Sequence, residues 1–134
     1  MQTIFPILRY EDARQAIRWL CKTFGFVEVF SVPDEGPIVR HAQLKLGSNV
    51  IMLGSSRPGE DLASPRAVGA ATQALYVYVV DVEGHFERAR AAGAKIVTPP
   101  SGTDFGSREY HVRDEEGHLW SFGTFLPAAE SSSK

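Results

Sequence analysis

The sequence predicts an α+β fold of two tandem βαβββ modules that form a curved mixed sheet around a cavity, with the helices on the outer face. Two observations support this prediction. The order of strand-like and helix-like patterns in the first half of the chain recurs in the second half, and matching landmarks recur at nearly constant spacing. These landmarks are Asp12 with Asp81, Gly25 with Gly93, Arg40 with Arg108, and Gly54 with Gly123, separated by 69, 68, 68 and 69 positions.

The first module is expected over about residues 3–54. It opens with an apolar strand, residues 3–8, and a helix follows because apolar residues recur on one helical face. That face consists of Ala13, Ala16, Ile17, Leu20, Cys21 and Phe24. Asp12 and Gln15 have the spacing of a capping box, and Gly25 ends the helix. Three strands are then expected, at residues 26–32, 40–46 and 50–53.

Residues 55–71 are rich in Gly, Pro, Ser and Ala and are expected to be a linker. The second module, about residues 72–125, should contain a strand at 74–80, a helix between Asp81 and Gly93, and strands at 95–98, 108–113 and 118–124. The polar tail, residues 127–134, is expected to be disordered. The whole chain, residues 1–134, is therefore predicted to be a single domain.

The composition excludes several classes of protein. The chain of 134 residues has a net charge of -2, and a nucleic-acid-binding protein would need a basic face. No apolar run approaches the ~18 residues of a membrane span, and the N-terminus does not resemble a secretory signal. Cys21 is the single cysteine and cannot form an internal disulfide. We therefore expect a cytoplasmic protein that binds neither nucleic acid nor membrane.

Three segments resemble the vicinal-oxygen-chelate (glyoxalase/bleomycin resistance/dioxygenase) superfamily, and within it a PhnB-like or bleomycin-resistance-like subgroup. They are PILRYEDARQAIRWLCKTFGF, VYVVDVEGHFERARAAGAKIVTPP and FGSREYHVRDEEGHLWSFGT. The resemblance covers about residues 3–125. It implies a homodimer with cavities at module or subunit interfaces, but it does not fix the function, because this fold hosts isomerases, dioxygenases, thiol transferases and non-catalytic drug binders.

In metal-dependent members, four cavity-facing His, Gln or Glu side chains bind one divalent ion. The resemblance places these positions at Phe5, Met52, Leu75 and Ser121. Phenylalanine and leucine have no donor atom, a thioether is too soft for such an ion, and a neutral hydroxyl is a weak ligand. A shift of register by one residue introduces no better ligand than the phenol of Tyr76. We therefore expect neither a metal nor another cofactor.

Strand alternation also predicts which residues face the cavity. The predicted apolar floor consists of Phe5, Ile7, Met52, Leu75, Val77, Leu119 and Ser121, and the third strands add His41, Gln43, Glu109 and His111. From these we predict a ligand-binding set of Phe5, His41, Gln43, Met52, Leu75, Glu109, His111 and Ser121, and we assign no catalytic residue. Two simpler interpretations stay open, since the apolar residues could fill the cavity as core and the polar ones could be solvated.

Three functions are compatible with this pattern. The leading hypothesis is a metal-free protein that binds a small apolar or aromatic molecule, for example to sequester a drug. The alternative is a metal-dependent lyase, isomerase or dioxygenase with a displaced site at His41, Glu109 and His111. The third is a structural module with a filled cavity. Outside the cavity, Trp19 and Trp120 are expected in the core or a dimer interface, and His85 and His118 at the surface.

Overall fold

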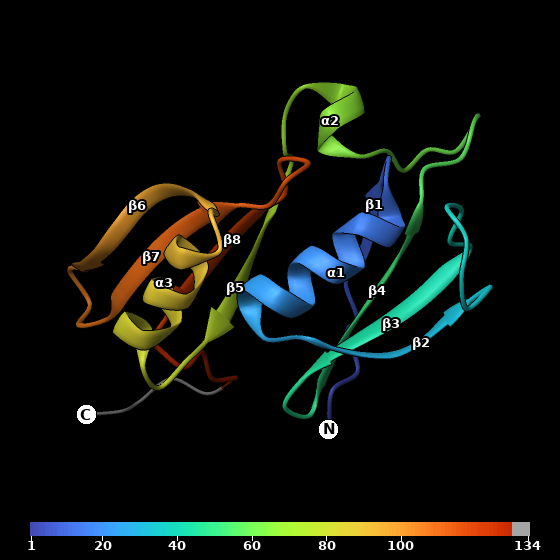
Figure 1. Ribbon diagram of the computed structural model, residues 1–134. Coiled ribbons are helices and arrows are strands. Elements are labelled where there is room, and N and C mark those ends of the chain that lie inside the picture. Colours follow the sequence, from blue (N-terminus) through green and yellow to red (C-terminus); the bar gives the residue numbers. More distant parts are fainter. Residues whose placement is uncertain (130–134) are drawn as a thin grey trace.

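The computed structural model describes residues 1–129 and contains two βαβββ modules joined by a segment with one short helix (Figure 1). The first module contains β1 (Ile7–Tyr10), α1 (Ala13–Phe24), β2 (Val27–Val32), β3 (His41–Leu46) and β4 (Asn49–Ser55). After α2 (Pro65–Val68), the second contains β5 (Ala74–Tyr78), α3 (Val82–Ala91), β6 (Lys95–Gly102), β7 (Arg108–Arg113) and β8 (Leu119–Gly123). The predicted duplication is confirmed.

Each module builds its own four-stranded sheet, in the order β1-β4-β3-β2 and β5-β8-β7-β6. The first and last strands of each module run parallel, and the other neighbours are antiparallel. The two sheets stay separate and do not close into one curved sheet. A single chain therefore does not enclose the cavity that the sequence predicts. Within residues 1–129, no helix has the length and apolarity needed to cross a bilayer.

The two long helices begin where the sequence predicts. The carboxylates of Asp12 and Asp81 accept hydrogen bonds from the backbone N–H three residues further on, which satisfies a donor that the first helical turn leaves free. Gly25 ends α1 in the left-handed conformation, with φ of 91°. The capping box is only half formed, because the side chain of Gln15 contacts Arg18 and Glu115 instead of returning to Asp12.

The hydrophobic core lies on the helix side of both sheets. Four residues that alternate with the cavity-facing positions of β3 and β7 are fully buried. They are Ala42, Leu44, Tyr110 and Val112. Phe24, at the end of α1, has its ring centroid 4.7 Å from Phe122 and 5.3 Å from Trp120 of the second sheet. The two modules therefore share one core. Trp120 belongs to this core as expected, whereas Trp19 is half-buried at its edge.

The turn between β7 and β8 fixes the second module to the first. The buried carboxylate of Asp114 accepts hydrogen bonds from the Tyr10 hydroxyl at 2.6 Å and the Trp120 indole at 3.1 Å, as well as from three backbone N–H groups of its own turn. Glu116, also buried, accepts from the backbone N–H groups of Glu11 and Asp12 at 2.6 and 2.8 Å. The second module thus holds the start of α1.

The segment between the modules folds back on the first one. Ser64 caps α2, and Glu60 accepts two hydrogen bonds from Arg9 of β1, at 2.8 and 2.9 Å. Two parallel hydrogen bonds between a guanidinium and a carboxylate hold the two groups in a fixed orientation. The segment between the modules is therefore structured and belongs to the first module. Of the tail expected to be disordered, residues 130–134 lie outside the described residues.

His85 is not a surface residue, contrary to the sequence-based expectation. It is half-buried on α3, with its ring centroid 4.1 Å from that of Phe122. Nδ1 lies 2.6 Å from the Tyr110 hydroxyl and Nε2 lies 3.1 Å from the Phe24 carbonyl. Because the carbonyl can only accept, Nε2 carries a proton. The Tyr110 hydroxyl is placed to donate to Nδ1, an arrangement that suits the neutral imidazole.

Acid should therefore destabilise the fold through His85. Burial lowers its pKa below the ordinary value of 6.5; the Phe24 carbonyl opposes this effect and the Arg88 cation adds to it. Near and below pH 6.5, the imidazole binds a proton more readily in the unfolded chain than in the folded chain. The contribution of neutral His85 to the free energy of unfolding is therefore complete above about pH 7 and declines toward about pH 5. Urea unfolding across this range should show a decline that His85→Gln reduces and His41→Gln does not. An unchanged decline in His85→Gln would contradict this assignment.

Candidate functional site

The first sheet has one face covered by α1 and one face without a helix. Strand register puts Ile7 beside Met52, Met52 beside Gln43, and Gln43 beside Phe30 on the uncovered side. We call the surface formed by Ile7, Phe30, Val32, His41, Gln43 and Met52 the first open face. Its apolar side chains are solvent-accessible, with 44% of Ile7 and 41% of Phe30 exposed. Exposed apolar side chains on both edge strands, β1 and β2, therefore form part of this face.

The second sheet repeats the arrangement with more polar residues. Tyr76 lies beside Ser121 and Ser121 beside His111, while Tyr78 and Glu109 flank Gly123. We call the surface formed by Tyr76, Tyr78, Glu109, His111, Leu119 and Ser121 the second open face. The two open faces occupy matching positions, since Ile7 and Tyr76, like Met52 and Ser121, are 69 residues apart.

A polar cluster lies at the centre of the second open face. The Ser121 hydroxyl is 2.6 Å from Nδ1 of His111, and Nε2 of His111 is 3.9 Å from a carboxylate oxygen of Glu109. The Tyr76 hydroxyl donates to the Phe125 carbonyl at 2.5 Å. Burial raises the pKa of this phenol. The cluster offers a mixed set of donors and acceptors that could orient a ligand.

Gly123 allows the cluster to be compact. A Cβ atom at this position would lie 2.6 Å from Cγ of Glu109 and 2.7 Å from the hydroxyl oxygen of Tyr76. Any larger residue would displace these two side chains. Close packing on the second open face therefore explains why a glycine occupies this landmark position of the internal repeat.

The structure corrects the placement of Leu75. Leu75 is in register with Trp120 and Val77 with Phe122, so both face the helix side and not the open face. Tyr76 takes the position expected for Leu75. The prediction was wrong because alternation within a strand does not fix the register between β5 and β8, and a shift of one residue reverses the face.

The other predicted residues divide between the two sheets. His41, Gln43 and Met52 lie on the first open face, and Phe5 lies two residues before the start of β1 with 41% of its surface exposed. Glu109, His111 and Ser121 come together on the second open face. Within one chain His41 belongs to a different sheet from Glu109 and His111, so the displaced three-residue site is not assembled.

The side chains at the family's metal positions do not fit a divalent ion. The uncovered positions of the first and last strands carry Ile7 and Met52 in one module and Tyr76 and Ser121 in the other. None of these is a carboxylate or an imidazole, which such ions prefer. Within residues 1–129, no three His, Cys, Asp or Glu side chains come together as a potential metal site.

A separate apolar hollow of about 670 Å³ lies between the modules. Leu46 and Ile51 line one side of it, and Leu75 and Val77 line the other. Leu75 therefore borders a concave surface, but a different one from the face that carries Ser121.

Two βαβββ modules with uncovered sheet faces define the fold class of the vicinal-oxygen-chelate proteins. The family model described as "Glyoxalase/Bleomycin resistance protein/Dioxygenase superfamily" matches residues 3–122. The chain belongs to this superfamily. An uncharacterised protein of Mycobacterium tuberculosis strain H37Rv is 34% identical to it over 121 residues, which cover 88% of this chain and 71% of the relative.

Solved structures agree with this assignment. TioX from Micromonospora sp. ML1 has 35% sequence identity and a TM-score of 0.78, with 94% of this chain and 100% of TioX covered. The fosfomycin resistance protein FosX from Mesorhizobium loti has a TM-score of 0.65 over 93% of this chain and 92% of its own. Its identity is only 15%, so this second likeness concerns the fold alone.

Proposed function

We propose that this chain is a metal-free small-molecule-binding protein of the bleomycin-resistance type. The observation that carries the proposal is the pairing of a largely apolar open face, whose first and last strands carry Ile7 and Met52, with a second open face that holds a compact polar cluster. A largely apolar surface with a few converging polar groups is typical of a site for a small organic molecule.

The two faces suggest separate roles in binding. Phe5 and Met52 offer an aromatic ring and a polarisable thioether to a flat ligand, with His41 and Gln43 beside them. On the other face, Ser121, His111 and Glu109 offer hydrogen bonds that fix the ligand's orientation. Tyr76 replaces Leu75 in the proposed set, because it shares the face of Ser121.

We further propose that the working form is a homodimer, in which the first open face of each copy lies against the second open face of the other. Among residues 1–129, no helix covers either open face, because α1 and α3 pack in the shared core on the other side of the sheets (Figure 1). Exposed apolar side chains rimmed by polar groups are typical of surfaces that pair with a partner. The binding groove would then lie between two subunits.

A thermal-shift screen tests ligand binding. Aromatic drugs, thiols and short oxo-acids are each added with and without EDTA, and an aromatic compound is expected to raise the melting temperature equally in both conditions. Saturation at 100 times the dissociation constant adds about 2.7 kcal/mol of stability, which is roughly 5–10 °C for a domain of this size. His111→Ala should reduce the shift, whereas His118→Ala, which alters a histidine bonded to the Arg9 carbonyl, should leave it intact.

Metal analysis of the purified protein tests the competing proposal that the chain is a metal-dependent enzyme. One divalent ion per chain, or a thermal shift that EDTA abolishes, would favour the second candidate, a metal-dependent lyase or dioxygenase. The specific observation in its favour is the approach of Glu109 and His111 on one face at 3.9 Å. In that case His41 would have to come from the facing sheet of the partner copy.

A further inference from the structure

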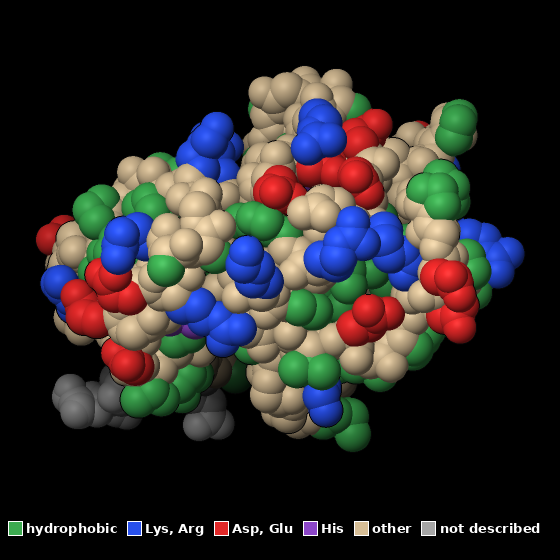
Figure 2. All heavy atoms as spheres, viewed as in Figure 1, with side chains coloured by type: hydrophobic (Ala, Val, Ile, Leu, Met, Phe, Trp, Pro, Cys, Tyr) green, Lys and Arg blue, Asp and Glu red, His purple; other side chains and the backbone are tan. Residues whose placement is uncertain are grey.

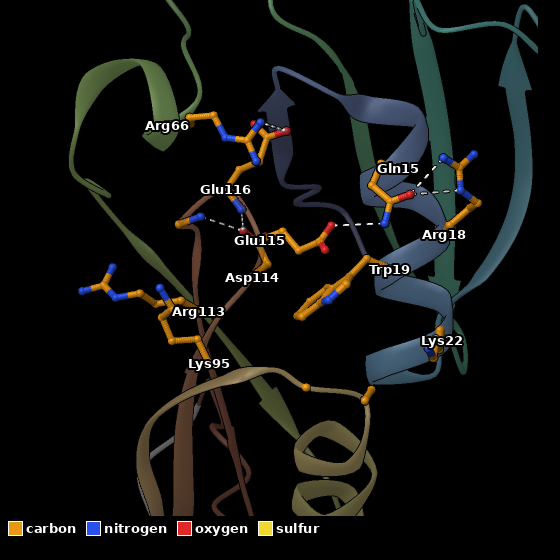
Figure 3. A pocket seen from close by; sticks show the side chains of 13 residues that line it. Gln15, Arg18, Trp19, Lys22, Arg66, Lys95, Arg113, Asp114, Glu115 and Glu116 are labelled. Carbon is orange, nitrogen blue, oxygen red and sulfur yellow. Dashed lines mark hydrogen bonds and ion pairs between the residues drawn. The ribbon is translucent and has the colours of Figure 1, made fainter.

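A large hollow lies beside α1, and none of the residues that line it belongs to either open face. It has a volume of about 920 Å³ and lies between α1 and the end of the second sheet where β6 begins and β7 ends (Figure 3). The side chains that matter here are Arg18, Trp19, Lys22, Arg66, Lys95 and Arg113.

The charge of this hollow is unbalanced. Its lining contains five Arg and Lys side chains and three acids. Two of the acids, Asp114 and Glu116, are buried and occupied by hydrogen bonds. Glu115 is the remaining acid, and it is exposed. Figure 2 shows Lys and Arg side chains spread around the region where α1 meets the second module.

Most of these cations have no acidic partner. Arg66 lies 3.8 Å from Glu116, whereas no ion pair within residues 1–129 involves Arg18, Lys22, Lys95 or Arg113. Lys95 and Arg113 face each other directly across the β6–β7 ladder. Like charges placed opposite one another on adjacent strands repel, and a bound anion would relieve that repulsion. The chain as a whole has a net charge of -2, so the concentration of positive charge is local.

Trp19 supplies an aromatic surface in the same hollow. Its ring packs edge-on against Phe24, with centroids 5.0 Å apart, and it is half-buried. Among residues 1–129 no group accepts a hydrogen bond from its indole N–H, while the indole of Trp120 donates to Asp114 at 3.1 Å. In Figure 3 the ring of Trp19 extends from α1 toward the side on which Lys95 and Arg113 lie. A half-buried indole with a free N–H is suited to a flat ligand that has an acceptor.

We propose that this hollow binds an organic anion with a planar aromatic ring, the ring against Trp19 and the acidic group between Lys95 and Arg113. A carboxylate or phosphate satisfies the lysine as a point charge and the guanidinium through paired hydrogen bonds. The site differs from the proposed ligand groove, because the hollow shares no lining residue with the two open faces. It does not depend on the proposed function.

The two tryptophans make a direct test possible. In an amide-correlation NMR spectrum of the ¹⁵N-labelled protein, 1-naphthyl phosphate is expected to shift the indole signal of Trp19 saturably and to leave that of buried Trp120 in place. Trp19→Phe identifies the signal. Inorganic phosphate tests the anion without the ring, and 1-naphthol tests the ring without the anion; both should bind at least about tenfold more weakly, the loss expected for one good charge-assisted contact.

Charge-matched variants complete the test. Lys95→Gln and Arg113→Gln should each weaken binding of 1-naphthyl phosphate by about fivefold, and Lys45→Gln, which removes an exposed lysine of β3, should not change it. Equal affinity for inorganic phosphate would reduce the site to a general anion attraction and overturn the proposal. A stationary Trp19 signal, or equal weakening by Lys45→Gln, would overturn it as well.

Discussion

Replacement of Asp114 by alanine is expected to lower the free energy of unfolding by about 3–5 kcal/mol. The Asp114 carboxylate is the common acceptor for the Tyr10 hydroxyl, the Trp120 indole and three backbone N–H groups. Both side-chain donors are buried, with about 1% of each residue exposed. Without Asp114, the Tyr10 hydroxyl and the Trp120 indole are buried donors without an acceptor. This lowers the free energy of unfolding more than the loss of a solvent-exposed hydrogen bond, whose donor water can satisfy.

Urea unfolding monitored by circular dichroism measures this effect. Glu115→Ala is the matched control, since it removes an exposed carboxylate from the same turn, and it should change stability by no more than about 0.5 kcal/mol. Asp114→Asn keeps the shape and one acceptor oxygen and should fall between the two. If Asp114→Ala were as stable as Glu115→Ala, the turn would not be the junction that joins the modules.

Local patterns in the sequence were sufficient to predict most of the fold. The apolar face of α1, its start after Asp12 and its end at Gly25 depend on neighbours within a few residues, and the structure confirms all three. The bounds of β7 were predicted correctly because strict alternation and a following acidic-Gly turn mark both of its ends. Recurrence of these signals in both halves then identified the topology.

Long-range contacts explain what the sequence did not reveal. The partners of Glu116 are backbone groups more than 100 positions away, so nothing near the turn marks it as a junction. His85 lies on a helix of modest amphipathicity, and its burial depends on Phe24 and Phe122 from other elements. The face of Tyr76 depends on its pairing with Ser121 of β8, which alternation within β5 alone does not reveal.

The packing of the helices also determines what the sheets can do. Phe24 of α1 contacts the second sheet, and Arg88 of α3 donates to the carbonyls of Cys21 and Lys22. These contacts join the helix sides of the two modules, and no helix within residues 1–129 covers either open face (Figure 1). An isolated chain would therefore expose its proposed binding residues on two separate surfaces.

Substitution of Ile7 by aspartate is the second change with a large expected effect, here on subunit association. Ile7 lies on edge strand β1 of the first open face beside Met52, with 44% of its surface exposed. If the second open face of another copy covers it, the new carboxylate is buried without a partner, at a cost of several kcal/mol. The dimer dissociation constant should then rise by at least about 100-fold, with the secondary structure retained.

Sedimentation velocity over a range of concentrations measures this change, and Ile38→Asp provides the matched control. Ile38 is 63% exposed in the loop between β2 and β3, so the same substitution there adds an equal charge at a solvated position and should leave the dimer intact. A wild-type protein that stays monomeric at high concentration, or an Ile7→Asp variant that dimerises as the wild type does, would contradict the proposed assembly. Ligand binding should be lost together with the dimer, because the apolar and polar halves of the groove would come from different copies.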